Sequence, residues 1–190
     1  MIIERGWGML QITVPGTELF DEATETFIQT KDTQLKLEHS LLSISKWESR
    51  WCKPFLATDK KDKLTPAEFL DYIRCMTLNS NVPKDVYNAL TPDNMTAITN
   101  YINHPMTATT VTDNSNNPFK KEVVTSELIY YWMVAYQIPF ECEKWHIHRL
   151  IMLIKVCNAK NNPKKMSKRE VLTQNRALNA ARKKALNTKG

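Results

Sequence analysis

A chain of 190 residues with 42% hydrophobic and 24% charged residues has the composition of a globular protein with one domain and extensions. Only 4 residues are glycine. Because sandwiches and barrels of β-strands need many glycine-containing turns, this scarcity argues against an all-β fold and favours helices. No basic run followed by a long apolar segment opens the chain, so no signal peptide is expected.

The formal net charge of +6 is concentrated at the C-terminal end. Residues 159–190 contain ten basic residues and one acid, Glu170, and so carry +9, which leaves −3 for residues 1–158. Such a tail binds nucleic acid non-specifically, docks on acidic protein surfaces, or stays solvated. No aromatic residue follows Trp145 to stack on bases, so nucleic acid is the least favoured of these partners.

The N-terminal region, residues 1–34, is predicted to form a strand followed by an arm, after a leader over residues 1–8. Leu10, Ile12 and Val14 alternate with polar residues, which is the period of a half-buried strand, and a Pro-Gly turn ends it. The next segment is either an irregular arm or a short strand. It contains four acids and two phenylalanines, namely Glu18, Phe20, Asp21, Glu22, Glu25 and Phe27.

Residues 35–158 are predicted to form a helical core domain. Apolar residues at helical spacing predict a helix over 35–51, which Pro54 ends. Further helices are expected over 83–90 and 91–103, because each of these segments has a proline where the first turn would start.

Another helix start is marked by Thr65 and Glu68, at the spacing of a capping box, and this helix should run to about Met76. In a capping box, the threonine hydroxyl accepts a hydrogen bond from the backbone N–H of the glutamate, and the glutamate carboxylate accepts one from the backbone N–H of the threonine. Further along, Val123-Val124 is expected to pair with the extended segment that starts at Pro105 as a small β-hairpin.

The most apolar and aromatic stretch runs from Leu128 to Val156, and Pro139 divides it. Proline disfavours helix in the residue before it, so one helix is expected over 126–138 and a second over 141–158. The first is apolar nearly all round, which predicts burial on several sides. Charged residues such as Arg149 interrupt the stretch before the about 20 apolar residues of a membrane span, so no membrane contact is expected.

The predicted fold class is mainly α, or α+β with a minor β element: a compact helical domain with an N-terminal strand, a small hairpin and a basic C-terminal helical tail. The tail, residues 159–190, is expected to hold one helix that starts at a second capping box, Ser167 and Glu170, and ends near Leu186. Its apolar stripe is weak and its charge is high, so it should gain order on a partner.

No catalytic motif is present, because the chain has neither a glycine-rich phosphate loop nor a GxSxG sequence. Cys142, His146 and Cys157 fall on one helix face and raise the alternative of zinc, but structural zinc sites normally combine ligands from separate elements. Cys142 and His146 raise the alternative of a thiolate–imidazole pair, without an orienting third group. We therefore predict no enzyme, metal or cofactor, and expect reduced cysteines in a cytosol.

Several stretches along the chain are distinctive as sequence. They are Leu37–Glu48, Trp51–Leu56, Phe69–Met76, Pro105–Thr109, Ile129–Met133, Ile138–Cys142, Arg176–Asn179 and Leu186–Gly190. Together they resemble a family of proteins from long-tailed bacteriophages, encoded near the tape measure gene and described as tail assembly chaperones. The resemblance covers nearly the whole chain after Met9.

The resemblance implies a non-enzymatic chaperone in the host cell cytoplasm that coats the tape measure protein, shields its apolar stripes and recruits tail tube subunits. Self-association is compatible with this role. The alternatives are a structural virion component, such as a connector or tail protein, and non-specific nucleic-acid binding through the tail. Core packing is the alternative for each tryptophan below. The residues predicted to contact a partner are Trp47, Trp51, Trp132, Trp145, Lys164, Lys165, Lys168, Arg169, Arg176, Arg182, Lys183 and Lys184.

Overall fold

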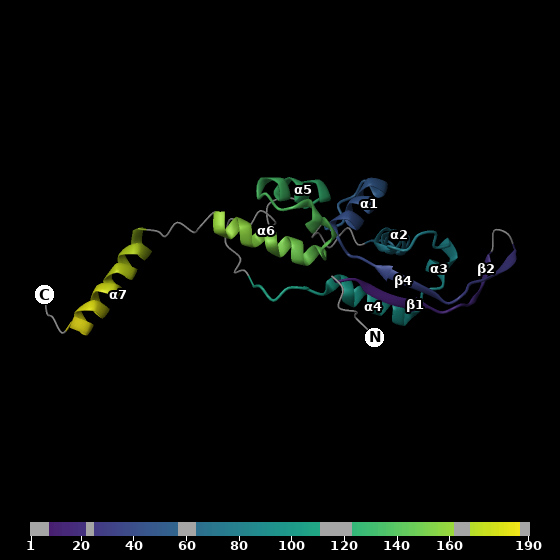
Figure 1. The fold of residues 1–190 in the computed structure, drawn as a ribbon, viewed down its shortest axis with the longest axis horizontal. Helices are drawn as coiled ribbons and strands as arrows, with labels where there is room; N and C mark the ends of the chain where they lie inside the picture. The colour runs from purple at the N-terminus through teal and green to yellow at the C-terminus, as the bar shows by residue number, and fades with distance from the viewer. Residues whose placement is uncertain (1–7, 22–24, 57–63, 111–122, 162–167, 187–190) are drawn as a thin grey trace. The chain divides into compact units, whose positions relative to one another are not determined.

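The computed structural model describes residues 8–21, 25–56, 64–110, 123–161 and 168–186 (Figure 1). The chain divides into two compact units, 1–157 and 158–190, and each is described by itself. Helices dominate the described residues of both, and the named strands all lie near the N-terminus. The predicted fold class, mainly α with a minor β element, is therefore confirmed.

Four strands form a ribbon of two antiparallel pairs. β1 (Leu10–Val14) pairs with β4 (Thr33–Leu37), and β2 (Glu18–Asp21) pairs with β3 (Thr26–Gln29). Between the pairs, the Thr30 backbone N–H donates to the Thr17 carbonyl oxygen at 2.8 Å. The strand predicted at Leu10–Val14 is thus confirmed, and the acidic segment after it continues the same ribbon.

β4 occupies residues that the apolar spacing assigns to a helix. Leu35 and Leu37 are buried while Gln34 and Lys36 are exposed, which is the alternation of a half-buried strand. The predicted helix over 35–51 therefore begins only after β4. For the same reason, the boundary expected between residues 34 and 35 falls inside a strand, and the ribbon belongs to the same unit as the helices.

The helices of the first unit follow the ribbon. Among the described residues they are α1 (Leu41–Trp51), α2 (Pro66–Met76), α3 (Lys84–Asn88), α4 (Pro92–Asn103), α5 (Ser126–Ala135), the 3₁₀-helix η2 (Phe140–Lys144) and α6 (Ile147–Asn161), whose last residues belong to the second unit. The predicted start of α2 is confirmed, since Thr65 Oγ1 accepts from Glu68 N at 3.3 Å. Thr91 caps α4 in the same way.

Pro139 separates α5 from α6 as predicted, but α6 starts later than the sequence indicates because η2 comes first. After η2, His146 pairs with Ser40 in an isolated antiparallel bridge, and Ile147 N donates to the His39 carbonyl oxygen at 2.9 Å. This pairing with the end of the ribbon holds the backbone extended, so the helix cannot continue through it.

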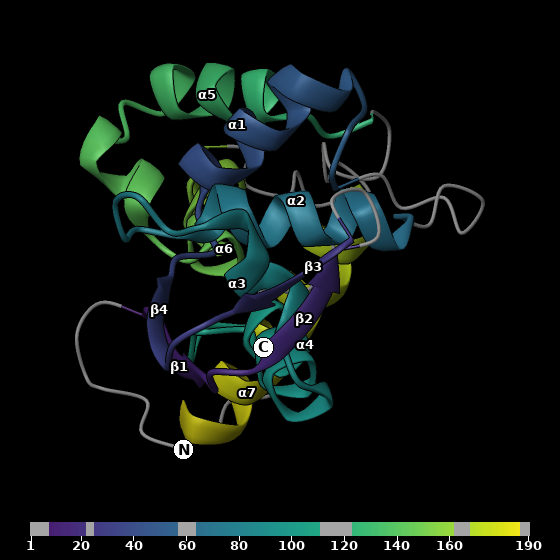
Figure 2. The same cartoon turned by 90° about the vertical axis from the view of Figure 1, so that its right-hand side faces the viewer.

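The core of the first unit lies between the β1–β4 pair and the helices. Figure 2 shows α5 above α1, with α2 and the strands below them. Strand β4 and the helices α1, α2, α4, α5 and α6 contribute large side chains that are completely removed from water, and such burial is the main source of stability. The largest of these are Trp47, Tyr72, Leu35, Leu37, Leu41, Ile44, Ile73, Met76, Ile98, Ile129, Met133 and Ile147.

Some predicted features fall partly or wholly outside the described residues. The segments 105–110 and 123–125 form no strand, and the rest of the small hairpin predicted there lies outside the described residues. The same holds for most of the leader over residues 1–8 and for Ser167. In the second unit, α7 (Lys168–Leu186) ends where the sequence predicts.

Candidate protein-binding surface

α5 has one buried face and one exposed apolar face. Ile129 and Met133 are fully buried, whereas Tyr131 and Val134 are 65% and 62% exposed. Residues three apart are neighbours on a helix surface, so these two exposed side chains lie side by side. The predicted burial on several sides is therefore wrong for this face of α5.

A buried carboxylate of α1 holds α5 in place. Ser126 N donates to Glu48 Oε2 at 2.7 Å, and Phe55 N donates to Glu48 Oε1 at 2.8 Å. One side chain thus fixes both the start of α5 and the turn that follows α1. The exposed face of α5 is consequently presented by a helix whose own position is set by the core.

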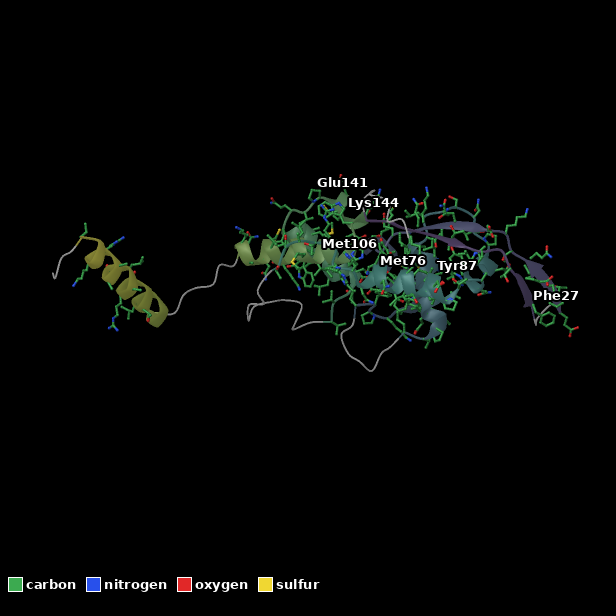
Figure 3. The ribbon with its side chains drawn as sticks, turned by 90° about the horizontal axis from the view of Figure 1, so that it is seen from below. Phe27, Met76, Tyr87, Met106, Glu141 and Lys144 are labelled. Atoms are coloured by element: carbon green, nitrogen blue, oxygen red, sulfur yellow. The ribbon has the colours of Figure 1, made fainter. Side chains whose placement is uncertain are left out.

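The 3₁₀-helix η2 adds a third exposed apolar side chain, Phe140. Its ring centre lies 6.3 Å from that of Tyr130, whose hydroxyl donates to Glu143 Oε2 at 2.8 Å. Burial and the Glu143 carboxylate raise the pKa of Tyr130, so it stays a neutral donor. Charged Glu141 and Lys144, labelled in Figure 3, belong to the same 3₁₀-helix as Phe140. We call Tyr131, Val134 and Phe140 the α5–η2 patch.

Two of the four tryptophans predicted to contact a partner are core residues. Trp47 is fully buried and Trp132 nearly so, and neither presents a surface. Trp51 and Trp145 are half-buried and keep exposed edges. The Arg149 guanidinium lies 4.2 Å from the centre of the Trp145 ring, within cation–π range. Core packing, the alternative for each tryptophan, therefore describes Trp47 and Trp132.

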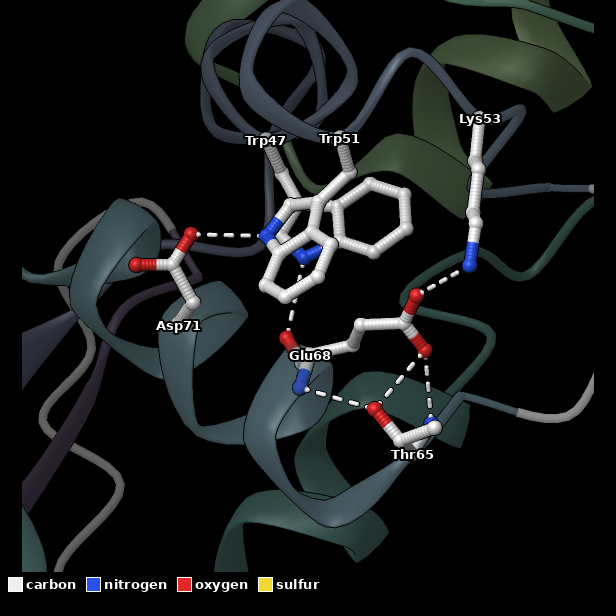
Figure 4. Close-up of polar contacts among 6 residues, drawn as sticks. All are labelled: Trp47, Trp51, Lys53, Thr65, Glu68 and Asp71. Atoms are coloured by element: carbon white, nitrogen blue, oxygen red, sulfur yellow. Dashed lines mark hydrogen bonds and ion pairs between the residues drawn. The ribbon is translucent and has the colours of Figure 1, made fainter.

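Polar contacts between α1 and α2 orient Trp47 and Trp51 (Figure 4). Trp47 Nε1 donates to the Glu68 carbonyl oxygen at 2.9 Å, and Trp51 Nε1 donates to Asp71 Oδ2 at 3.0 Å. Lys53 Nζ lies 2.5 Å from Glu68 Oε1, and this bond is the main reason why the pKa of Glu68 is lowered to about 2. These polar tips are paired within the interface, so the cluster stabilises helix packing.

Three histidines gather where β4 ends and α6 begins. The ring centres of His39 and His146 lie 4.9 Å apart, and those of His146 and His148 lie 5.3 Å apart. His39 Nδ1 hydrogen-bonds with the Tyr72 hydroxyl, and His146 Nε2 lies 3.1 Å from the Tyr101 carbonyl oxygen. Burial lowers the pKa of His146 to about 4 and that of His39 well below its usual value, so both rings are neutral at pH 7.

The chemical alternatives find no support in the described part of the chain. No three histidine, cysteine, aspartate or glutamate side chains among the described residues are placed to hold a metal ion. Burial raises the pKa of the Cys142 thiol, whereas a thiolate nucleophile requires a lowered one. Cys142 and His146 also belong to different segments, η2 and the bridge before α6, rather than to one helix face.

The predicted contacts of the basic tail lie in α7 or just before it. Those with described, exposed side chains are Arg176, Arg182 and Lys183. α7 also contains Lys168, Arg169 and Lys184, whose side chains are not described, and Lys164 and Lys165 lie outside the described residues. The structure therefore places exposed cations on one helix without showing what they bind.

Sequence reasoning does not single out the α5–η2 patch, because α5 is apolar on every side. A helix that is apolar all round carries little periodic signal to separate an exposed face from a buried one. The available hint is the pair Tyr130 and Tyr131, since a tyrosine needs a partner for its hydroxyl when buried. Tyr130 finds Glu143, and Tyr131 is exposed.

Comparison of the chain with protein-family models, with curated proteins and with solved structures gives no match. Within the described residues, no helix has both the length and the apolar character needed to cross a bilayer.

Proposed function

We propose that this chain is a non-enzymatic tail assembly chaperone of a long-tailed bacteriophage. It binds the tape measure protein in the host cytoplasm and helps to recruit tail tube subunits. The observation that carries the proposal is the α5–η2 patch, an apolar surface on a helix whose other face is buried in the core. The distinctive sequence stretches support the same role by resemblance.

The patch has the chemistry that an amphipathic helix requires of its partner. Helix-binding surfaces offer apolar side chains to residues at i, i+3, i+4 and i+7 of the bound helix. Tyr131 and Phe140 supply large, rigid aromatic surfaces, which dominate the energetics of many interfaces. A tape measure protein with apolar stripes along a long helix would bury those stripes against such a patch.

Peptides that tile the tape measure protein of the same phage test this contact. We expect the full chain to bind some of them, and Y131S/V134S to weaken that binding about tenfold or more, because both side chains lose contact area. The matched control is L78S/V123S, which removes two exposed apolar side chains elsewhere. Equal binding by Y131S/V134S and by wild type would contradict the assignment of the patch.

Quantitative mass spectrometry of purified particles and infected-cell lysate tests the role itself. A chaperone is abundant in the lysate and absent from particles. A fixed copy number in particles would instead identify a structural virion component, the second candidate, which the exposed phenylalanines of the β2–β3 pair favour. Non-specific nucleic-acid binding through the tail is tested by deleting residues 160–190, which should abolish DNA binding. If the intact chain does not bind DNA at low salt, this candidate function is excluded.

A further inference from the structure

The ribbon ends in an acidic arm, residues 17–29, whose described strands β2 and β3 lie apart from the core (Figure 1). Among the described residues, β2 and β3 pair only with each other. Phe20 faces Phe27 across the pair, with ring centres 5.2 Å apart, and the two side chains are 54% and 67% exposed. Figure 3 shows Phe27 at the far end of the first unit from Glu141 and Lys144.

The arm carries charge of one sign. Its four ionisable residues are Glu18, Asp21, Glu22 and Glu25, and it contains no lysine or arginine, so its charge is −4. A two-stranded hairpin is marginally stable in water by itself, and the two exposed rings add an apolar surface without cover. The arm therefore favours a partner that is both cationic and apolar on one side.

Helix α7 has this combination of properties. It contains six basic residues and one acid, and so carries +5. At about 100° per residue, its exposed leucines fall within about 120° of the helix circumference. These leucines are Leu172, Leu178 and Leu186. Cations lie on the same side of the helix: Arg176 and Lys183 are close in angle to Leu172. Arg182 lies in angle between Leu178 and Leu186.

We propose that the arm of one copy binds α7 of a second copy, so that copies associate head to tail. The leucines of α7 cover the two phenylalanine rings, and its arginines and lysines face the carboxylates of the arm. Opposite charges on the two surfaces speed association and fix its orientation. Ordering on this surface also accounts for a helix whose own apolar stripe is too weak to fold alone.

Both complementary surfaces belong to this chain, so identical copies can use their arm and their α7 at the same time. A second copy therefore requires no partner of other chemistry, and its binding depends on protein concentration.

A contact between two different surfaces repeats from copy to copy. Such head-to-tail association closes into a ring or continues as a filament, depending on the angle between neighbours. The inference uses neither the α5–η2 patch nor the tape measure protein. It therefore holds for a chaperone that leaves the particle and for a virion component that stays.

The experiment measures self-association of the full chain by sedimentation over a range of protein concentrations, at about 50 mM and about 500 mM salt. We expect wild type to associate at low salt and to dissociate at high salt. F20S/F27S in the arm and R176E/R182E in α7 should each weaken association about tenfold or more. K46E/K84E makes the same change in net charge at exposed sites elsewhere and should associate as wild type does.

Mixing the two defective variants gives the decisive measurement. F20S/F27S keeps its α7 and R176E/R182E keeps its arm, so the mixture should form a one-to-one pair that grows no further. Wild type that stays monomeric at low salt, or a mixture without the pair, would overturn the proposal. The proposal would also be overturned if R176E/R182E lost DNA binding but self-associated as wild type does. Circular dichroism checks that each variant is folded, and Y131S/V134S should associate normally even if the proposed function fails.

Discussion

The two halves of the ribbon have the same backbone pairing and very different surroundings. In β1–β4, the inward side chains pack against the helices, and Leu35 and Leu37 are fully buried. In β2–β3, Phe20 and Phe27 pair across the strands in a similar way but remain exposed to water. Strand pairing alone therefore does not make a core. The difference lies in what covers the strands, and only the covered half is expected to contribute much to stability.

The largest expected effect comes from removing a covered side chain. L37A should lower the free energy of unfolding by about 3 kcal/mol, because it deletes buried methyl groups and leaves a cavity. Urea unfolding followed by circular dichroism measures this. A loss below about 1 kcal/mol would mean that the β1–β4 pair is not part of the cooperative core.

A change of pH should act at the covered end of the ribbon, where His146 bonds to Tyr101. The pKa of His146 is about 4 when folded and 6.5 in its ordinary state, so the unfolded chain binds a proton first. Stability is therefore complete above pH 6.5 and falls as the pH drops towards 4, by about 3 kcal/mol for this group.

Thermal unfolding between pH 7 and pH 4 measures this dependence. H146Q is the matched variant, because glutamine can still donate to the Tyr101 carbonyl oxygen but does not titrate. The wild-type curve should fall more steeply than that of H146Q below pH 6.5. Parallel curves would show that the buried histidine does not govern acid stability.

The smallest expected effect comes from the uncovered half. F20A/F27A should change the free energy of unfolding by no more than about 0.5 kcal/mol, because the two rings are already exposed in the folded chain. The same urea experiment measures it beside L37A. A loss as large as that of L37A would mean that the arm is covered in solution even in a single copy.

Local signals in the sequence predict a large part of this fold. Alternation predicts β1, the capping box of Thr65 and Glu68 predicts the start of α2, a proline in the first turn predicts the start of α4, and Pro139 predicts the break between α5 and α6. Each of these depends on residues that are close in the chain. Capping and alternation act through neighbouring backbone groups, so they survive whatever the rest of the protein does.

The errors arise where distant segments pair. Leu35 and Leu37 fit a helical spacing, yet pairing with β1 makes them a strand. The segment around His146 fits a helix, yet pairing with Ser40 keeps it extended. For the candidate surface, the sequence indicates the helical hairpin but not which side of α5 is free, because that depends on where α1 packs.

The hydrogen bond from Ile147 to His39 can form only late in the synthesis of the chain. The two residues are more than 100 positions apart in the chain. A ribosome adds about 5–20 residues per second, so His39 is made roughly 5–20 seconds before its partner. During that interval the start of α6 has not been synthesised, so it cannot yet pack in the core with the leucines of β4. A nascent chain of this protein therefore has a long period in which its N-terminal ribbon can meet other nascent copies before its own fold closes.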